Sequence, residues 1–318
     1  MSQLIVETSA PEAVSASVRI SPPKIAAVVV TRNRLKLLQR LLGCLSRQTR
    51  KLDAIIVVDV NSDDGTTEFL RAAGEPIIPV YLTHNAGGAG GFHEGMKRAH
   101  EDGFDWLWAM DDDGFPDDTA LEKITDRLDQ TDAKWINSMV VETENPERLA
   151  WVLPYRDGFS EDLKALRALG PIVNGSSPFN GTLIHRSLID AIGLPCKELF
   201  IWGDEMEFKR RAEGAGFRTV SITDSMFHHP APPHGSVTTV PLKSFRKYYY
   251  KVRNSQAVAD RNGKPALNYA EARAEGRNYI RTLLKDSVRV PLHNLIKISI
   301  IVRAIWAARR NDTRHFKL

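Results

Sequence analysis

Three adjacent aspartates, Asp111, Asp112 and Asp113, follow the apolar segment WLWAM of residues 106–110. Carboxylates held this close together repel one another, so a fold that gathers them usually offsets their charge with a cation. Oxygen ligands favour Mg²⁺ or Mn²⁺, and both ions also bind diphosphates. The residues therefore indicate a divalent metal site, with a solvated acidic loop as the alternative.

A glycine-rich segment, NAGGAGGF, occupies residues 85–92 and precedes a helix-like run. Glycines let the backbone approach a ligand closely, and the first N–H groups of a helix attract anions. The segment matches neither the GxGxxG dinucleotide fingerprint nor the GxxxxGK[ST] phosphate loop. It indicates either an anion-binding turn of another kind or an ordinary glycine-rich turn.

A second group of acids, Asp204, Glu205 and Glu207, begins a helix-like stretch directly after Trp202-Gly203, and His229 follows further along. A carboxylate at a helix start can act as a general base, and an imidazole at a strand end can bind a metal. Taken alone, such acids more often complement the helix dipole. The occurrence of all three groups in one order on one predicted sheet favours a catalytic site.

An alternation of short apolar segments and helix-like segments positions these residues. The predicted strands are residues 25–30, 54–59, 76–83, 106–110, 135–142, 179–185 and 219–229, and the predicted helices include residues 35–48, 66–74, 118–129 and 205–216. Such alternation with short connections predicts a parallel, doubly wound α/β sheet. Ligands of such sheets bind beyond the carboxyl ends of the strands, where the aspartates lie.

Composition limits the class of protein. With 318 residues, of which 42% are hydrophobic and 26% charged, the chain is globular and too large for a small disulfide scaffold. Its two cysteines, Cys44 and Cys196, indicate a reducing compartment. Residues 1–22 are rich in Ser, Ala and Pro and are expected to form a mobile lead-in without the features of a signal peptide. A cytoplasmic protein is expected.

The net charge of +4 conceals two oppositely charged parts. Residues 236–318 contain 18 Lys and Arg against 5 Asp and Glu, a net +13, which leaves −9 for residues 1–235. In this basic region FRKYYYKVRN interleaves aromatic and basic residues, and LIKISIIVRAIWAARR is too charged to span a bilayer. Two interpretations stay open: a segment on an anionic membrane with Trp306 at headgroup depth, or helices packed on the preceding domain. RNA binding is a third, less favoured interpretation.

Together these segments resemble a known family. VVVTRNR, SRQT, VVDVNSDDGT, NAGGAGGF, WAMDDD and WGDEMEFKRRAEGAG resemble successive motifs of the inverting, metal-dependent, GT-A-type glycosyltransferases of family 2, across residues 24–230. The glycine-rich segment, the triple aspartate and FIWGDEME look most like bacterial galactofuranosyltransferases, with rhamnosyltransferases as near neighbours. The resemblance implies a GT-A domain, Rossmann-like with a mostly parallel sheet, over residues 23–235, and a helical basic extension over residues 236–318.

The resemblance also implies roles for individual residues. Glu205 would be the catalytic base, with Asp204 as the alternative. Asp111, Asp113 and His229 would hold Mn²⁺ or Mg²⁺, with His228 as the alternative histidine. The residues expected to bind the nucleotide-sugar donor are Thr31, Arg32, Asn33, Asp59, Asn85, Gly87, Gly88, Gly90, Gly91, Asp112 and Trp202.

The sequence departs from the family pattern in three respects. Val60 stands where many relatives have a second aspartate after the one matching Asp59, which weakens any detailed assignment of uracil contacts. Glu205 replaces an aspartate and moves the carboxylate one methylene outward, which is why Asp204 stays an alternative base. The large N-terminal β-domain of polymerising galactofuranosyltransferases has no counterpart, which favours one or a few transfers.

The expected function is metal-dependent, inverting transfer of a sugar from a nucleotide donor, with UDP-galactofuranose favoured. The expected acceptor is a hydroxyl of a lipid-linked glycan in cell-envelope polysaccharide synthesis, handled at the inner face of the membrane. Three alternatives stay open: transfer of rhamnose from dTDP-rhamnose, a nucleotide-sugar-binding protein without activity, and a nucleotidyltransferase. The last would need a glycine- and basic-rich loop where this chain has TRNR. An oligomer is compatible with the sequence, and nucleic acid is not expected as a partner.

Overall fold

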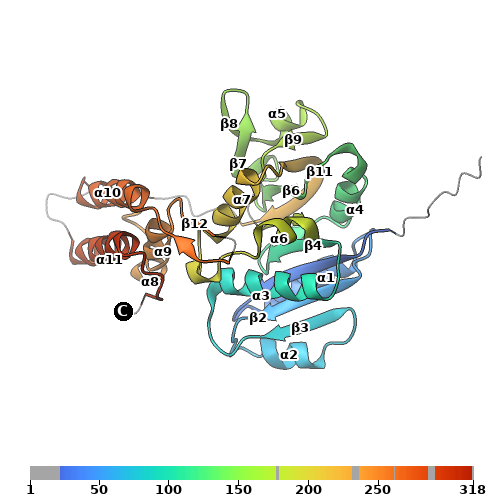
Figure 1. The fold of residues 1–318 in the computed structure, drawn as a ribbon, viewed down its shortest axis with the longest axis horizontal. Helices are drawn as coiled ribbons and strands as arrows, with labels where there is room; N and C mark the ends of the chain where they lie inside the picture. The colour runs from blue at the N-terminus through green and yellow to red at the C-terminus, as the bar shows by residue number, and fades with distance from the viewer. Residues whose placement is uncertain (1–21, 177–178, 231–235, 261, 286–290, 317–318) are drawn as a thin grey trace, which may run out of the picture.

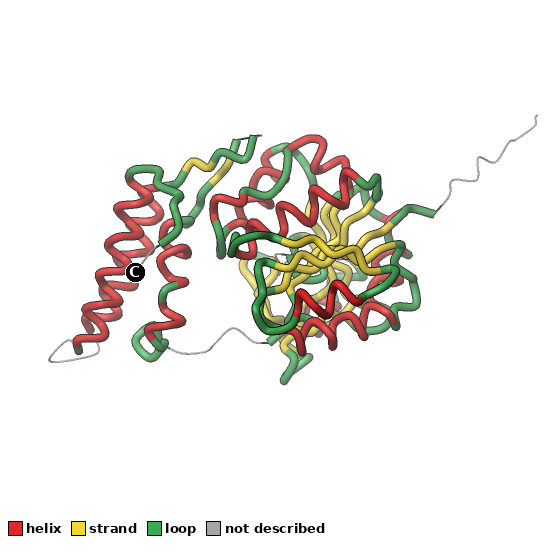
Figure 2. The backbone as a smooth tube through the Cα atoms, turned by 90° about the horizontal axis from the view of Figure 1, so that it is seen from below, coloured by secondary structure: helices red, strands yellow, loops and turns green. Residues whose placement is uncertain are grey.

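Strand β1 (Ile25–Thr31) is buried along its whole length because helices cover both faces of its sheet. Successive side chains of a strand point to opposite faces, so its odd-numbered residues pack with α1 (Leu35–Ser46) and its even-numbered residues with α3 (Gly87–Glu101). The computed structural model describes residues 22–176, 179–230, 236–260, 262–285 and 291–316. Helices lie on both sides of the sheet in Figures 1 and 2.

The central sheet is mixed but mainly parallel. Its strands β2 (Ala54–Asp59), β3 (Ile77–Tyr81), β4 (Trp106–Asp111), β5 (Phe115–Pro116), β6 (Trp135–Glu142), β10 (Thr182–His185) and β11 (Thr219–His229) run in the order β3-β2-β1-β4-β10-β6-β11-β5. Strands β1 to β4 pair in parallel, as do β6 and β11, whereas β10 is antiparallel to both β4 and β6. The predicted α/β fold with a mostly parallel sheet is confirmed.

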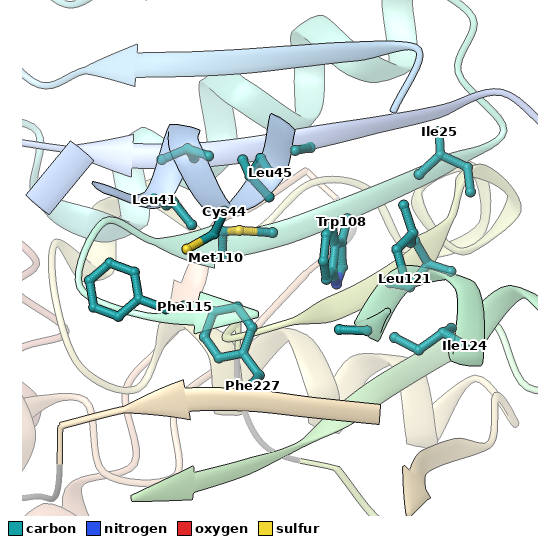
Figure 3. Close-up of a cluster of buried hydrophobic side chains, with 14 of the residues drawn as sticks. Ile25, Leu41, Cys44, Leu45, Trp108, Met110, Phe115, Leu121, Ile124 and Phe227 are labelled. Carbon is teal, nitrogen blue, oxygen red and sulfur yellow. The ribbon is translucent and has the colours of Figure 1, made fainter. Parts of the chain in front are cut away.

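The helices of this domain largely follow the predicted segments. They are α2 (Thr66–Ala72), α4 (Ala120–Thr125), α6 (Arg186–Ile192) and α7 (Asp204–Gly214), with 3-10 turns η1 (Leu128–Gln130) and η2 (Lys197–Leu199). Figure 3 shows the core on the α1 face, where side chains of α1, β4, α4 and β11 meet around the fully buried Trp108.

The sequence analysis missed a peripheral part of the sheet. This part comprises the hairpin of β7 (Arg148–Tyr155) and β8 (Gly158–Asp162), the short helix α5 (Leu163–Arg167) and strand β9 (Ile172–Asn174). Strand β8 is exposed or half-buried along its length, so it carries no continuous apolar pattern. These elements are short and lie at the edge of the sheet, where the pattern of a sequence is weakest.

Helix α3 begins earlier than the glycine-rich segment suggests. It starts at Gly87, so most of the glycines lie inside the helix and not in a turn before it. A Cβ atom on Gly91 would lie 2.4 Å from Cγ1 of Val30, and one on Gly95 would lie 2.6 Å from Cγ1 of Val28. These two glycines therefore let α3 approach the valines of β1 closely, and they are explained by packing.

The C-terminal helical unit, residues 236–316 where described, lies beside the sheet domain in Figures 1 and 2. It contains α8 (Leu242–Phe245), α9 (Lys247–Arg253), α10 (Tyr269–Lys285), α11 (Leu292–Arg309) and a small hairpin of β12 (Val258–Ala259) and β13 (Pro265–Ala266). Its own apolar core also packs against Phe200 and Ile201 of the sheet domain. The helical extension is thus confirmed, and it is docked onto the preceding domain.

No helix in the described parts of the chain is long and apolar enough to cross a bilayer. Residues 1–21 of the expected lead-in fall outside the described residues, as do residues 231–235 at the expected end of the sheet domain. The exact domain limits therefore stay predictions.

Candidate active site

Strand register brings the predicted site residues to one edge of the sheet. In the parallel pair of β1 and β2, Thr31 lies opposite Asp59, and β4 ends at Asp111 beside the last residues of β1. After the triple aspartate the chain turns into β5, which pairs antiparallel with the end of β11. This long-range pairing carries His229 to the aspartates.

Asp112 is the buried member of the triple aspartate, with 2% of its surface exposed. It accepts a hydrogen bond of 2.7 Å from the Thr31 hydroxyl and one of 2.8 Å from Nη1 of Arg34. Both of its carboxylate oxygens are therefore engaged within the protein. Asp112 ties the end of β1 to the end of β4, and this role explains its burial without a ligand.

Asp113 lies between two cationic partners. Nη1 of Arg34 donates to it at 2.7 Å, and Nε2 of His229 lies 3.4 Å from its Oδ1 atom. Burial acts to raise the pKa of Asp113, but the hydrogen bond with His229 and the charge of Arg34 outweigh it and lower the pKa. Burial likewise acts to lower the pKa of His229, and its contact with Asp113 reverses the direction and raises it. The two side chains form an ion pair when His229 is protonated.

Among the three aspartates, Asp111 has the most strongly raised pKa. Removal of water from its carboxyl group, together with the charges of Asp113 and Asp112, raises its pKa to about 8. His229 partly offsets this effect, and Glu205 adds to it. Asp111 therefore holds a proton at neutral pH when no cation is bound.

The ligand chemistry at this edge fits a divalent cation. Two carboxylates and an imidazole act on one another electrostatically, and a cation bound between them would favour the ionised form of Asp111. Among the described residues, however, no three His, Cys, Asp or Glu side chains are already arranged as a metal site. Asp113 and His229 are in contact with each other, but Asp111 does not complete a three-ligand group with them.

The two neighbouring histidines have different partners. Nε2 of His228 lies 2.9 Å from Oδ1 of Asp117, away from the triple aspartate. His229 faces Asp113, and its ring packs against the Trp151 ring with the centroids 4.7 Å apart. His229 thus lies beside the triple aspartate, whereas His228 lies beside Asp117, and the identity of the metal-binding histidine stays a prediction.

The acids of α7 stand on an unusual backbone. Phe200 and Trp202 have positive φ angles of 70° and 57°, and Gly203 at the start of the helix has a φ of 99°. Such conformations are costly for bulky side chains and occur mainly at functional sites. Asp204 and Glu205 follow directly, in the first turn of α7.

Asp204 and Glu205 differ in exposure and in protonation. Asp204 is 2% exposed, and burial, the charge of Glu205 and a hydrogen bond with Glu205 raise its pKa well above the usual value. The charge of Asp111 adds to this effect. Asp204 therefore favours its protonated form and shares a hydrogen bond with Glu205, which is half-exposed at the same edge as the aspartates.

Glu207 serves the structure of the domain. It is fully buried and pairs with Arg211, whose Nε lies 2.5 Å from Oε1 of Glu207. The same oxygen accepts a hydrogen bond of 2.7 Å from the backbone N–H of Ala259 in the C-terminal helical unit. Glu207 therefore fixes α7 in place. Its carboxylate is engaged by Arg211 and Ala259, in contrast to the two acids before it.

The residues predicted to bind the nucleoside bridge the loops after β1 and β2. Asp59 is buried and accepts hydrogen bonds from the Ser62 N–H and the Thr67 hydroxyl. The Asn33 side chain accepts a bond of 2.8 Å from the Asp63 N–H, whereas Arg32 is exposed. These contacts shape the loops, and any contact with a nucleoside stays a prediction.

The predicted glycine-rich segment lies at the start of α3. Oδ1 of Asn85 accepts a hydrogen bond of 3.0 Å from the Gly87 N–H, and Gly87 has a φ of 71° that favours glycine. A Cβ on Gly87 would lie only 1.9 Å from the Phe200 carbonyl oxygen, and one on Gly90 would meet Ala86 at 2.4 Å. Gly88 alone faces open space, so it is the glycine with room for a ligand beside it.

Comparison with known proteins agrees with this arrangement. The family model described as Glycosyl transferase family 2 matches residues 26–181. The chain is 36% identical over 217 residues to galactofuranosyltransferase GlfT1 of Mycolicibacterium smegmatis, an alignment that covers 65% of this chain and 70% of that protein. The chain belongs to glycosyl transferase family 2. The resemblance inferred from the motifs is confirmed, and the protein is a glycosyltransferase.

Other relatives of this glycosyltransferase are also named as sugar transferases. GlfT1 of Mycobacterium tuberculosis is 36% identical over 214 residues, covering 65% of this chain and 70% of that protein. The dTDP-rhamnosyl transferase RfbF of Shigella flexneri is 24% identical over 247 residues, covering 76% of this chain and 82% of RfbF.

Solved structures share the fold. The crystal structure of S. aureus TarS 1-349 in complex with UDP has a TM-score of 0.51 and 15% identity, covering 91% of this chain and 88% of that one. GalNAc-T7 with UDP, GalNAc and Mn²⁺ has a TM-score of 0.51 and 13% identity, covering 73% of this chain and 50% of that one. At these identities the likeness establishes the GT-A-type fold of this glycosyltransferase and nothing finer.

One residue in the site of this glycosyltransferase was not assigned from the sequence. Arg34 is bonded to both Asp112 and Asp113, and despite the opposing effect of burial these charges raise its pKa further above the usual value. The signal was available in the motif TRNR, because a basic residue at the end of one strand faces the acids at the end of its neighbour. The residues assigned from this motif ended at Asn33, directly before Arg34.

We predict that Glu207→Ala lowers the free energy of unfolding by about 3–5 kcal/mol, because it leaves Arg211 buried without its carboxylate partner. Urea denaturation measures this change. Met206→Ala is the matched control on the same helix turn, since Met206 is 40% exposed, and it should change stability by no more than about 0.5 kcal/mol. A loss below about 1 kcal/mol for Glu207→Ala would contradict the structural role of this residue.

Proposed function

We propose that this glycosyltransferase transfers galactofuranose from UDP-galactofuranose to a hydroxyl group of a glycan acceptor, with inversion at the anomeric carbon. The observation that carries the proposal is the placement of Glu205 and Asp204 within electrostatic range of Asp111 at the carboxyl edge of the sheet. The 36% identity to GlfT1 galactofuranosyltransferases supports this donor.

Glu205 is the catalytic base in this proposal. Asp204, whose pKa is raised, donates a hydrogen bond to Glu205, and the half-exposed Glu205 carboxylate accepts the proton of the acceptor hydroxyl. The hydroxyl oxygen then forms a bond to the anomeric carbon while the bond from that carbon to the diphosphate oxygen breaks. UDP leaves with the bonding electron pair.

The leaving diphosphate requires a counter-charge at the same edge. Asp113 and His229, joined by Asp111, would hold Mn²⁺ or Mg²⁺, and a bound cation would stabilise the negative charge on the departing UDP. Arg34 holds Asp112 and Asp113 in place. The presence of Mn²⁺ in the fold neighbour GalNAc-T7 is consistent with such a site.

The alternative donor is dTDP-rhamnose. RfbF of Shigella flexneri, a dTDP-rhamnosyl transferase, aligns with a larger share of the chain than GlfT1, although at only 24% identity. The motifs do not tell which nucleobase and sugar the donor carries, because Val60 stands where many relatives have a second aspartate. The choice between the two donors therefore rests on experiment.

A lipid-linked acceptor and a location at the cytoplasmic membrane surface complete the proposal. The solvent face of α11 exposes Leu292 (74%), Leu295 (50%) and Trp306 (49%), so this helix is apolar on its outer side as well as in its core. The guanidinium groups of Arg309 and Arg310 lie over the Trp306 ring at 5.4 and 5.3 Å. Apolar side chains flanked by cations are suited to the interface of an anionic bilayer.

Charge on this helix supports a membrane over a protein partner. Residues 292–311 contain no Asp or Glu. Lys297 does not interrupt the apolar outer face, because it is 1% exposed and donates to the carbonyl oxygens of Val237 and Thr238. The exposed charge of α11 is therefore entirely cationic.

We predict that Glu205→Gln and Asp113→Ala each abolish most transfer while the fold persists. Loss of a general base typically costs about 10²–10⁴-fold in rate. Initial rates with UDP-galactofuranose, Mn²⁺ and a synthetic glycan acceptor measure the effect, and melting temperatures report the fold. Glu205→Asp serves as the conservative control and should retain part of the activity. A Glu205→Gln enzyme with a near-normal rate would assign the base to Asp204.

Thermal stabilisation by nucleotides should identify the donor. With Mn²⁺ present, UDP and UDP-galactofuranose are expected to raise the melting temperature, while dTDP and dTDP-rhamnose have little effect, because only the bound nucleotide stabilises the native state. Omission of the metal should reduce the shift. Stabilisation by the dTDP compounds alone would replace galactofuranose with rhamnose, without changing the reaction class.

We predict that the full-length enzyme floats with vesicles that contain anionic phospholipid and much less with neutral vesicles. Leu292→Glu with Leu295→Glu should reduce the bound fraction by about tenfold. Phe159→Glu is the matched control, because Phe159 is 72% exposed on β8, far along the chain from α11. Equal flotation of all variants would exclude this face, and a change from dimer to monomer in the double variant would instead identify it as a contact between two copies.

A further inference from the structure

The loop of residues 198–203, which leads into α7, is held by two side chains of the C-terminal helical unit. Asn254 is 1% exposed, and its amide nitrogen lies 2.9, 3.2 and 2.8 Å from the carbonyl oxygens of Leu199, Ile201 and Trp202. One side chain thus engages the carbonyl groups on both sides of Phe200.

Arg253 completes this arrangement. It is fully buried, and its Nε donates to Oδ1 of Asn254 at 2.8 Å, which fixes the orientation of the amide. Its Nη2 atom donates to the carbonyl oxygens of Glu198 and Leu199 at 3.3 and 3.0 Å. Its Nη1 atom donates to the carbonyl oxygen of Thr313 at 3.0 Å, close to the described end of the chain.

The loop so held carries the unfavourable backbone of the site. A positive φ is unfavourable for a bulky residue and persists only where the surroundings impose it. Here Phe200 and Trp202 have that conformation, and the carbonyl of Trp202 is among those that Asn254 binds. The Phe200 carbonyl accepts a hydrogen bond of 3.1 Å from Ala89 in the first turn of α3, so the loop also touches the glycine-rich segment.

We infer that Asn254 and Arg253 are positioning residues of the glycosyltransferase: they impose the backbone of residues 198–203 and thereby aim Glu205 at the acceptor. The inference rests on the proposed role of Glu205 as base. It gives the C-terminal helical unit a part in catalysis, because side chains of this unit bind carbonyl groups of the loop that leads into α7. Misplacement of a reacting group by about 1 Å can cost about 10²-fold in rate.

Asn254→Ala and Asn254→Asp test this inference in the full-length enzyme. Both remove the amide donors, and Asn254→Asp keeps the size of the side chain. We expect kcat for transfer to fall by about 10²-fold while the affinity for UDP, measured by titration calorimetry, changes by no more than about twofold. Amide hydrogen exchange of residues 199–203 should accelerate.

Asn294→Ala is the matched control. Asn294 is 2% exposed in α11 and donates to the Leu283 carbonyl at 3.2 Å, so it has the same chemistry inside the same unit without contact to the loop. It should lower stability similarly and leave kcat and loop exchange unchanged. Arg253→Lys tests the second member and should lower kcat less than Asn254→Ala, since a lysine can reach only some of these carbonyl groups.

The outcomes separate this inference from the proposed function. If Asn254→Asp and Asn294→Ala have the same kcat and the same loop exchange as the wild type, the positioning role is overturned. If the wild type transfers neither galactofuranose nor rhamnose, the proposed function fails. Amide hydrogen exchange of residues 199–203 in Asn254→Asp then still decides whether Asn254 holds the loop. If Asn254→Ala does not fold, Asn254→Asp supplies the comparison at a temperature below its melting transition.

Discussion

Repulsion among acidic side chains at one edge of the sheet is the constraint on which the site depends. The triple aspartate and the acids of α7 act on one another in surroundings from which much of the water is removed. The protein relieves the repulsion with Arg34 and His229 as partners, and burial together with the repulsion that is left raises the pKa values of Asp111 and Asp204. A nucleotide diphosphate would bring further negative charge to this edge, so the residues that balance charge here also decide which substrates can bind.

The sheet can hold this edge together because its central strands are buried on both faces. Close packing of α3 on β1, which Gly91 and Gly95 permit, leaves the carboxyl ends of the strands no freedom to separate. The strand β5 then turns the chain toward β11 and delivers His229 to Asp113. Asp112 locks the arrangement from within, since its bonds to Thr31 and Arg34 join two neighbouring strands.

Much of this architecture could be predicted from the sequence, and the limits have physical causes. Buried parallel strands such as β2 and β6 were predicted at their observed bounds, because continuous apolar segments between polar turns have few alternatives. The β7–β8 hairpin was missed, because exposed edge strands lack such a pattern. The glycine-rich segment was predicted to be an anion-binding turn or an ordinary turn, whereas it forms the start of α3, where Gly91 packs against Val30 in a contact that only the folded chain shows.

The roles of single polar residues were the hardest to predict, because they depend on partners distant in sequence. Glu207 and Glu205 are two residues apart on α7, yet Arg211 and Ala259 make the first a structural residue while the second faces the aspartates. Local sequence could not separate them.

The same reasoning changes the view of the C-terminal helical unit. The sequence left open a segment on an anionic membrane or helices packed on the preceding domain. In the structure Arg253 and Asn254 donate hydrogen bonds to the loop before α7. The α11 helix packs in one core with α9, which ends at Arg253. On the proposed function, the surface that meets the membrane and the loop that carries the base therefore belong to one packed body. A lipid-linked acceptor bound at that surface would be presented at a fixed height relative to Glu205, so the unit would set the geometry of the reaction as well as the location of the enzyme.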